Sequence, residues 1–352
     1  MVQVRLIGFV VGLSLVTASR ADSGRLTGNP LEHLPDNIEL LTSFGERADI
    51  SPDNRRIAFM DKTFGNAYVI DLAKRDIRCL TCHIPGAAFL RVMHLVTGDY
   101  LLIGPARFTE AAASRYQESE IWFLGKKPRA TPVALGVRLF EGAAVSKTSL
   151  MIGWAETAGQ NPDLRPQASR LLVAQLRLSG GTAAIVNKRV VHESRDASCV
   201  IEAQDFYDHD GRMTFTCYEH SGTASVMGLD LRTGAIVNFS KAPGTYNEAE
   251  GVFPDGHHTC VESDRQVAVL GGPGGSQQID IWKLRLDETG KDFERLTHFN
   301  DYEGWKASNP VVSTDGSFMA FQVAKVGDAP GAGRGILLYR FRAVRKESKR
   351  GR

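Results

Sequence analysis

Short apolar segments separated by tight polar turns recur along the chain. The clearest copy is residues 307–322, in which Val311 and Val312 precede the turn Asp315-Gly316 and an apolar run follows it. Asp and Gly tolerate the positive φ angles that a two-residue hairpin turn requires. The segment therefore predicts a β-hairpin. Three more copies turn at Asp53-Asn54, Asp210-Gly211 and Asp255-Gly256, and two weaker copies span residues 93–103 and 140–152.

A second element repeats in step with the hairpins. It reads Leu-Thr at Leu41-Thr42, Leu80-Thr81 and Leu296-Thr297, with a degenerate form at residues 238–241. A third apolar segment lies between hairpin and element, as at residues 67–72, 226–231 and 279–284. Each unit then holds four strands, which is the blade of a β-propeller. The repeats predict an all-β fold, a six-bladed β-propeller of four-stranded blades.

The chain ends predict how the ring closes. Residues 37–42 form a lone apolar segment before the first hairpin, and residues 335–341 supply one more strand after the last. We expect the N-terminal strand to enter the last blade and remove the open edge. The propeller then spans residues 37–342, after a lead-in at 22–36. The basic run at 343–352 is expected to be a solvated terminus.

The repeats also carry a resemblance. Ser51-Pro52-Asp53 with Ile57-Ala58-Phe59, and residues 312–316 with 319–321, resemble the WD-like repeats of TolB-type propellers, and so do the Leu-Thr elements. The resemblance covers roughly residues 35–340. That family includes interaction proteins, the propeller halves of peptidases and carbohydrate-active enzymes such as oligogalacturonate lyase. The resemblance therefore implies the fold and leaves the activity open.

The N-terminus is typical of an export signal. Arg5 precedes an apolar run at residues 6–16, and Ser19-Arg20-Ala21 fits the small-x-small cleavage rule. The run is shorter than the about 20 residues that a membrane-spanning helix needs. We interpret residues 1–21 as a signal peptide, and the alternatives are an uncleaved anchor or a chance apolar strand. The mature chain is expected to be periplasmic or secreted, without a membrane span.

Net charge and loop composition limit the classes of partner that the sequence favours. The formal net charge is +2, which gives no electrostatic argument for a nucleic-acid partner. Long polar or Gly/Pro-rich loops interrupt the strand pattern, and they are either a binding surface for a protein, peptide or saccharide or tolerated decoration. These loops are residues 106–119, 156–168, 271–275 and 327–335.

Cys79-Leu-Thr-Cys82-His83 matches the attachment motif of c-type haem. The repeat register argues otherwise, because Leu80-Thr81 occupies the place of Leu296-Thr297 in another blade. A local disulfide between Cys79 and Cys82, or two free thiols, therefore remains preferred over haem. The pairing of the other three cysteines cannot be read from the sequence.

Acidic and amide side chains precede several hairpins. In a propeller the innermost strand of each blade lines the central channel, so these residues should meet at one mouth of it. Carboxylate and amide oxygens suit a hard cation such as Ca²⁺ or a hydroxylated ligand, and the alternative is a solvated channel mouth. The candidate ligand-binding residues are Glu202, Gln204, Asp205, Glu248, Glu250 and Asn309, and the candidate metal ligands are Glu248, Glu250 and Asp205.

Catalytic motifs are sparse. The chain has no Gly-x-Ser-x-Gly motif, which argues against a peptidase of the prolyl-peptidase type. Oligogalacturonate lyase has a His-rich manganese site, and only the isolated His298 and Gln322 resemble parts of it here.

Three functions stay open. The leading hypothesis is a non-catalytic, exported binding protein that uses one face and the channel mouth. The second is a carbohydrate-active lyase or hydrolase with its site at that mouth. The third is a c-type haem protein.

Overall fold

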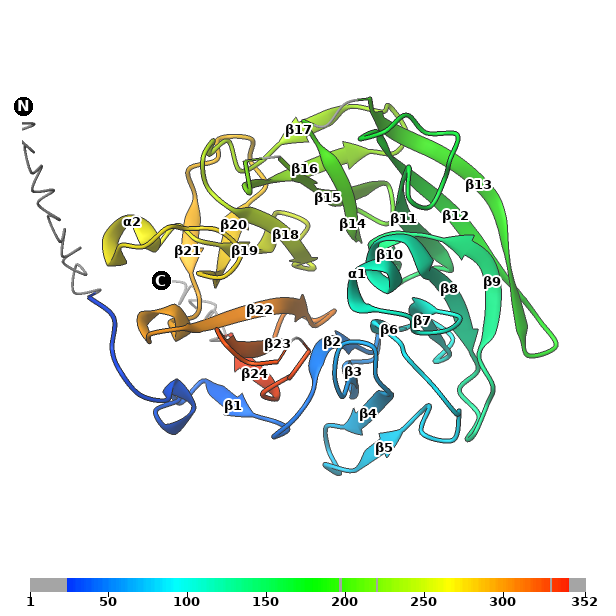
Figure 1. Ribbon diagram of the computed structural model, residues 1–352, viewed down its shortest axis with the longest axis horizontal. Coiled ribbons are helices and arrows are strands. Elements are labelled where there is room, and N and C mark those ends of the chain that lie inside the picture. The colour runs from blue at the N-terminus through cyan, green and yellow to red at the C-terminus, as the bar shows by residue number, and fades with distance from the viewer. Residues whose placement is uncertain (1–23, 196–197, 220, 330, 342–352) are drawn as a thin grey trace, which may run out of the picture.

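The computed structural model describes residues 24–195, 198–219, 221–329 and 331–341, and six four-stranded antiparallel sheets stand around one axis (Figure 1). The predicted six-bladed β-propeller is therefore confirmed. The expected signal peptide at 1–21 and the basic tail at 343–352 lie outside the described residues. Within the described residues, no helix has the length and apolar character needed to cross a membrane.

The first three blades follow one another along the chain. Blade 1 contains β2 (Glu46–Ile50), β3 (Arg56–Met60), β4 (Ala67–Asp71) and β5 (Ile77–Cys79). Blade 2 contains β6 (Arg91–His94), β7 (Tyr100–Pro105), β8 (Ser119–Leu124) and β9 (Val133–Arg138). Blade 3 contains β10 (Phe140–Val145), β11 (Met151–Thr157), β12 (Ser169–Ser179) and β13 (Thr182–Ser194).

The last three blades complete the ring. Blade 4 contains β14 (Val200–Tyr207), β15 (Arg212–Tyr218), β16 (Ala224–Asp230) and β17 (Ile236–Asn238). Blade 5 contains β18 (Asn247–Val252), β19 (His258–Ser263), β20 (Asp280–Arg285) and β21 (Phe293–Arg295). Blade 6 contains β22 (Trp305–Val312), β23 (Phe318–Lys325), β24 (Ile336–Arg340) and the N-terminal β1 (Ile38–Leu40).

The ring closes as predicted, through the N-terminal strand. β1 pairs antiparallel with β24, and Ile38 lies opposite Tyr339. The lead-in contributes a short 3₁₀ helix, η1 (Pro30–Glu32), and Leu26 forms a parallel bridge with Tyr302. The last blade therefore has four strands, and β24 has no open edge.

The Leu-Thr element has a definite structural role. Thr81 is fully buried, and its hydroxyl accepts a 2.9 Å hydrogen bond from the Ala67 N–H at the start of the third strand. Thr297 accepts from Ile281 N–H at 2.9 Å in blade 5. Thr42 and Ser240 make the same link in blades 6 and 4, to Ile336 and Val226. Each hydroxyl therefore satisfies a buried backbone donor that an apolar side chain would leave unpaired.

The hairpin turns are stabilised by their own side chains. Asp53 accepts a 2.6 Å hydrogen bond from Ser51 Oγ, and Ser51 Oγ in turn accepts from Arg56 N–H at 3.0 Å. Asp315 and Ser313 repeat this arrangement in blade 6. The Ser-x-Asp sequence therefore sets the point at which the chain reverses.

The core lies between adjacent blades. Ile50 and Phe59 of blade 1 pack with Phe318 and Ile336 of blade 6, and all four side chains are buried. Trp154 of blade 3 packs in the same way with residues of blade 2. Since each blade buries its faces against its neighbours, the ring is stable only as a whole.

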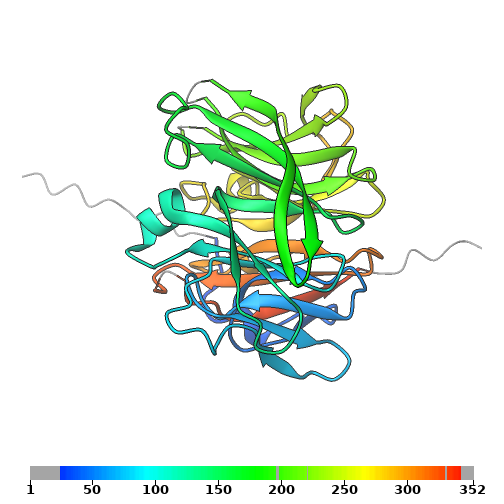
Figure 2. The same ribbon diagram turned by 90° about the vertical axis from the view of Figure 1, so that its right-hand side faces the viewer.

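The long loops all connect the second strand of a blade to the third. Innermost strands start on one face of the disc, so the antiparallel order places these connections on that same face, which we call the loop face. α1 (Ala111–Ala113) and η2 (Ser114–Glu118) form part of the β7–β8 loop, which projects from the sheets in Figure 2. The β19–β20 loop carries α2 (Val267–Leu270), and η3 (Phe299–Asp301) lies in the β21–β22 connection. The sequence pattern did not predict these short helices.

The buried hydroxyl links can be tested in blade 5. We predict that Thr297→Val lowers the free energy of unfolding by about 1–3 kcal/mol, because Ile281 N–H loses its acceptor in a dry environment. Urea denaturation measures the change. Thr289→Val is the control, because the Thr289 hydroxyl bonds Asp287 in an exposed turn, and it should cost at most about 0.5 kcal/mol. Equal effects of the two substitutions would contradict a special role for the buried hydroxyl.

Candidate functional site

Five of the six innermost strands carry a β-bulge, which gives one side chain a new direction. The register of the inner pair shifts between Glu46 and Asp49, Phe140 and Ala143, Ala203 and Asp205, Ala249 and Val252, and Ser308 and Val311. The bulged segments contain Arg47, Glu141, Gln204, Glu250 and Asn309. Arg47, Glu141 and Asn309 have positive φ angles of 54°, 57° and 50°. Polar side chains are therefore presented at equivalent positions around the axis.

All six blades contribute to a small central cavity of about 70 Å³. Arg47, Arg91, Gln204 and Glu250 belong to its lining nearer the loop face, and Lys147 reaches it from blade 3. This polar space is large enough for a few water molecules or an ion, and it is too small for a sugar ring. A larger hollow of about 660 Å³ opens among the hairpin turns of the opposite face.

Three glutamates from blade 5 meet beside this cavity. Carboxylate oxygens of Glu248, Glu250 and Glu262 all lie within 4.8 Å of one another, and the three residues are buried. Asn309 of blade 6 donates to Glu262 Oε1 through its backbone N–H at 2.5 Å and through Nδ2 at 3.3 Å. Asn309 Nδ2 also lies 3.5 Å from Glu250 Oε1. We call Glu248, Glu250 and Glu262 the glutamate trio.

A tyrosine links the trio to blade 4. The hydroxyl of Tyr218 lies 2.6 Å from Glu202 Oε2 and 2.6 Å from Glu248 Oε1, and the hydroxyl of Tyr246 donates to Glu248 Oε2. A hydroxyl has only one proton to donate, so the second short contact of Tyr218 requires a proton on a carboxyl group. Glu202 and Glu248 therefore share protons with the phenol between them.

Burial sets the charge state of these groups. It raises the pKa of Glu202 to about 8, although the nearby charge of Arg91 opposes the shift. Burial and, after it, the negative charge of Glu262 raise the pKa of Glu248 to about 7. The same two causes raise the pKa of Glu250 well above its usual range. Because these carboxyl groups interact, they titrate as a group. Several of them hold protons at neutral pH unless a cation takes the place of those protons.

Asp205 lies apart from the glutamate trio, although it was grouped with Glu248 and Glu250 as a candidate metal ligand. Its carboxylate accepts from Val252 N–H at 2.9 Å and from Phe206 N–H at 2.8 Å. It lines both the central cavity and the hollow of the opposite face. Burial raises its pKa to about 6, against the effect of these N–H donors and of Lys147. The observed trio contains Glu262 in its place.

Gln204 also differs from the other candidates. Its side-chain amide donates to Thr216 Oγ1 at 3.2 Å, and it lines the central cavity. Of the six candidates, Glu202, Glu248, Glu250 and Asn309 are thus brought together through Tyr218 and Glu262, whereas Gln204 and Asp205 border the cavity.

Several residues of the site were not predicted from the sequence. Arg47 lies six residues before Asp53, the same offset that separates Gln204 from Asp210 and Asn309 from Asp315. Counting back from the first hairpin turn would therefore have found it. Glu262 lies on a second strand, and Tyr218 lies at the end of another. No count along innermost strands can find those two residues.

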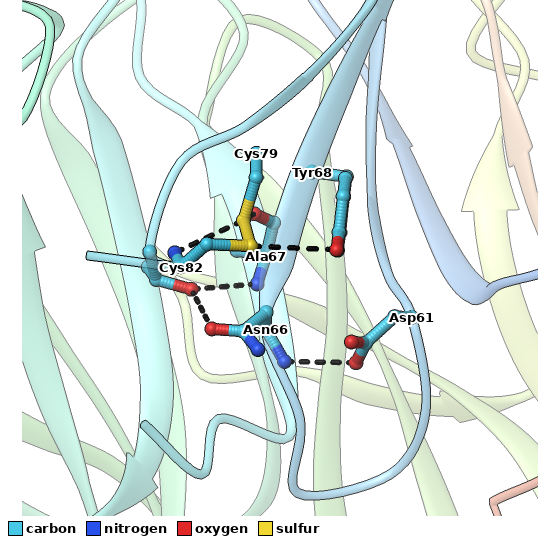
Figure 3. The surroundings of a disulfide bond; sticks show 7 residues. Asp61, Asn66, Ala67, Tyr68, Cys79 and Cys82 are labelled. Carbon is cyan, nitrogen blue, oxygen red and sulfur yellow. Dashed lines mark hydrogen bonds between the residues drawn. A yellow bond between two sulfur atoms is a disulfide. The ribbon is translucent and has the colours of Figure 1, made fainter. Parts of the chain in front are cut away.

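The Cys79-x-x-Cys82 motif lies at the outer edge of blade 1, far along the sheet from the innermost strand. The structure joins the two cysteines in a disulfide, beside Tyr68 and Ala67 (Figure 3). Cys82 N–H donates to Cys79 Sγ at 3.0 Å. Haem attachment would use both sulfur atoms, so it is incompatible with this bond. Cys199 and Cys217 form a second disulfide, and Cys260 is free and buried.

The protonated carboxyl groups predict a pH dependence of stability. The folded state holds protons that the unfolded chain releases above pH about 4.5, so stability should fall as pH rises from about 5 to 8, by about 1.4 kcal/mol per pH unit for each such proton. Glu248→Gln with Glu250→Gln mimics the protonated forms and should flatten this slope. Thermal melts across this pH range measure it, with exposed Glu294→Gln as control. A double variant with the wild-type slope would disprove the assignment.

Solved structures of other proteins have a similar fold, although their sequences differ widely from this one. No protein-family model and no curated protein matches the sequence. A solved oligogalacturonate lyase in complex with manganese is 10% identical, with a TM-score of 0.52 over 86% of this chain and 79% of that one. The oligogalacturonate lyase of Vibrio parahaemolyticus is 11% identical, with a TM-score of 0.49 over 85% and 79% of the two chains. TolB from Acinetobacter baumannii is 14% identical, with a TM-score of 0.43 over 79% of this chain and 65% of TolB.

The candidate metal group differs in kind from a histidine-rich site. Among the residues that the structure describes, the glutamate trio is the group of three or more possible metal ligands, and it contains no histidine. At identities this low, similarity to the solved structures shows the fold alone. The chain is thus an all-β, six-bladed propeller, similar in fold to the oligogalacturonate lyase in complex with manganese.

Proposed function

We propose that the protein is an exported, non-catalytic binding propeller that engages a partner through the loop face and the mouth of its channel. The observation that carries this proposal is that the long loops and the starts of the innermost strands share one face. Long loops held by a rigid scaffold commonly form a recognition surface. The narrow, charged cavity below that mouth supports binding of side chains or ions more than turnover of a large substrate.

Exposed apolar side chains also favour the loop face as the surface that binds a partner. Val269 in α2 is 89% exposed, and Phe108, Tyr116 and Val326 are also exposed. Three different loops carry these residues, and all three connect a second strand to a third. Four of the eleven exposed large apolar side chains of the described residues thus lie in these loops, and exposed apolar side chains that share a face can mark a protein-interaction surface. A protein or peptide is therefore the favoured partner class, and a saccharide is the alternative.

Site-specific photocrosslinking tests the proposal in cells that express the protein. A photoreactive residue at Val269 or Phe108 should give a discrete crosslinked product, because the partner covers these side chains. The same residue at Lys74 or Thr289, in exposed turns on the opposite face, is the control and should give none. Crosslinks of equal yield from both faces, or from the opposite face alone, would reject the loop face as the binding surface.

The glutamate trio is proposed to take up a cation, such as Ca²⁺, in place of its protons. Three carboxylates offer the oxygen ligands that Ca²⁺ prefers, whereas Asn309 presents its Nδ2 donor to Glu250 and Glu262. A cation would also relieve the repulsion between carboxylates that otherwise raises their pKa values. The positive charge of Arg91, which lowers the pKa of Glu248, opposes such uptake.

Calcium dependence can be measured directly. We predict that Ca²⁺ raises the melting temperature of the wild-type protein and that a chelator lowers it, because an ion that binds only the folded state stabilises it. The variant Glu248→Gln with Glu250→Gln should respond to neither. Isothermal titration with Ca²⁺ gives the stoichiometry. A wild-type melt unchanged by both Ca²⁺ and chelator would reject a metal at the trio and leave protons as its only occupants.

A second candidate function is a carbohydrate-active lyase or hydrolase. It is supported by the raised pKa values of Glu202 and Glu248, since a carboxyl group protonated at neutral pH can act as a general acid. Incubation with oligogalacturonate or neutral oligosaccharides, followed by analysis of product chain length, separates this candidate from a binding protein. Shortened products that disappear in Glu202→Gln would establish the enzyme.

A further inference from the structure

Three arginine side chains from three elements meet at the channel mouth. Arg47 comes from the bulge of β2, Arg91 from the first position of β6, and Arg115 from η2 in the loop above them. Arg91 packs on the bulge of β10, where a Cβ added to Gly142 would lie 3.5 Å from its Cζ. Arg115 Nε lies 3.3 Å from Glu141 in the same bulge. Arg47 and Arg91 both line the central cavity.

These guanidinium groups are incompletely satisfied. Seven buried side-chain nitrogen atoms have no hydrogen-bond partner among the described residues, and three of them are the Nε atoms of Arg47, Arg91 and Arg115. Arg115 Nε has an ion-pair contact with Glu141 at 3.3 Å in place of a hydrogen bond. Arg47 Nε lies 3.8 Å from Glu46 Oε1, which is too far for a hydrogen bond. A buried donor without an acceptor is costly, and the cost is greater for a charged group. The grouping of such donors favours an additional acceptor beside these side chains.

The charges around the arginines add to this argument. Burial lowers the pKa of Arg47, and the positive charges of Arg91 and Arg115 lower it further. The ammonium group of Lys306 is a fourth cation near the site, and it donates to Ser276 O at 3.0 Å. An anion between these cations would relieve their mutual repulsion. The side chains of Arg47, Arg91 and Arg115 are 11%, 17% and 27% exposed, so a ligand can reach their exposed parts although their Nε atoms are buried.

Neighbouring carboxylates limit the charge of that anion. Glu46 lies next to Arg47, Glu141 next to Arg115, and Glu202 lies 3.1 Å from Arg91 Nη2. Glu202 holds a proton at neutral pH, but the charges of Glu46 and Glu141 offset part of the positive charge of the arginines. The smaller net positive charge suits a singly charged group. The planar fork of a guanidinium matches the two oxygens of a carboxylate.

We propose that Arg47, Arg91 and Arg115 form a carboxylate-binding site at the mouth of the channel. The inference deepens the proposed binding function, and it rests on the mouth being the place where the ligand enters. The carboxylate can belong to a peptide, as an acidic side chain or a C-terminus, or to an acidic sugar. The chemistry at the arginines is the same in both cases, and the rest of the ligand would contact the loops.

Isothermal titration of the purified protein tests this site with three probes. Acetyl-alanyl-alanine offers a peptide carboxylate, galacturonate offers a sugar carboxylate, and sulfate offers a doubly charged oxyanion. We expect at least one carboxylate to bind saturably at millimolar concentration and about tenfold more tightly than sulfate. The stronger carboxylate identifies the source. Arg47→Gln should weaken that binding by about tenfold or more, since a charge-assisted hydrogen bond is lost.

Two further variants make the result decisive. Arg170→Gln is the matched control, because Arg170 Nε also lacks a partner but lies on β12, in the third strand of its blade. It should bind as the wild type does. Arg115 lies in a loop segment outside the sheets, so the variant Arg115→Gln is used in place of Arg47→Gln if Arg47→Gln does not fold. Wild-type affinity in the folded arginine variant, no saturable heat with either carboxylate, or tighter binding of sulfate would overturn the proposal.

Failure of this inference differs from failure of the proposed function. Photocrosslinking at Val269 reports a partner on the loop face, whatever lies at the arginines. Crosslinks from that face without carboxylate binding would remove the arginine site alone. Carboxylate binding without crosslinks would retain the site and remove the loop face as the partner surface.

Discussion

The pairing of β1 with β24 is the interaction on which the rest of the structure depends. It joins residues from opposite ends of the propeller, since Ile38 lies opposite Tyr339. Without it, blade 6 would have three strands and an open edge at β24. The innermost strands form a channel only while the ring is closed, because each blade buries its faces against its neighbours. Closure therefore determines which charged side chains meet at the axis.

Within the closed ring, bulges and burial determine the chemistry of the channel. The bulges turn one polar side chain of an innermost strand toward the axis, as at Arg47 and Glu250. Arginines come from blades 1 and 2, with Glu46 and Glu141 beside them, and the glutamate trio and Glu202 come from blades 4 and 5. Low exposure strengthens both the attraction between the two sides and the repulsion within each. Burial therefore raises the pKa values of Glu202 and Glu248 although Arg91 lies close to them.

The same geometry separates the two faces of the disc. Hairpin turns such as Asp53-Asn54 and Asp315-Gly316 lie on one face, where side-chain hydrogen bonds keep them short. Loops with α1 and α2 lie on the other, together with the channel mouth. The long loops and the charged cavity are thus adjacent, and the proposed ligand would contact the loops while it places a charged group among Arg47, Arg91 and Arg115.

The sequence by itself determined the repeat, the number of blades and the closing strand, because hairpin turns and Leu-Thr elements act through local hydrogen bonds that residue order specifies. It also placed Glu202, Glu248, Glu250 and Asn309 near one mouth, through their distance from those turns. Only the tertiary structure decided that Glu262 and Tyr218 complete the cluster and that Asp205 stands apart from it. The physical reason is that bulges and contacts between blades depend on neighbours distant in sequence, and a count along one strand cannot include them.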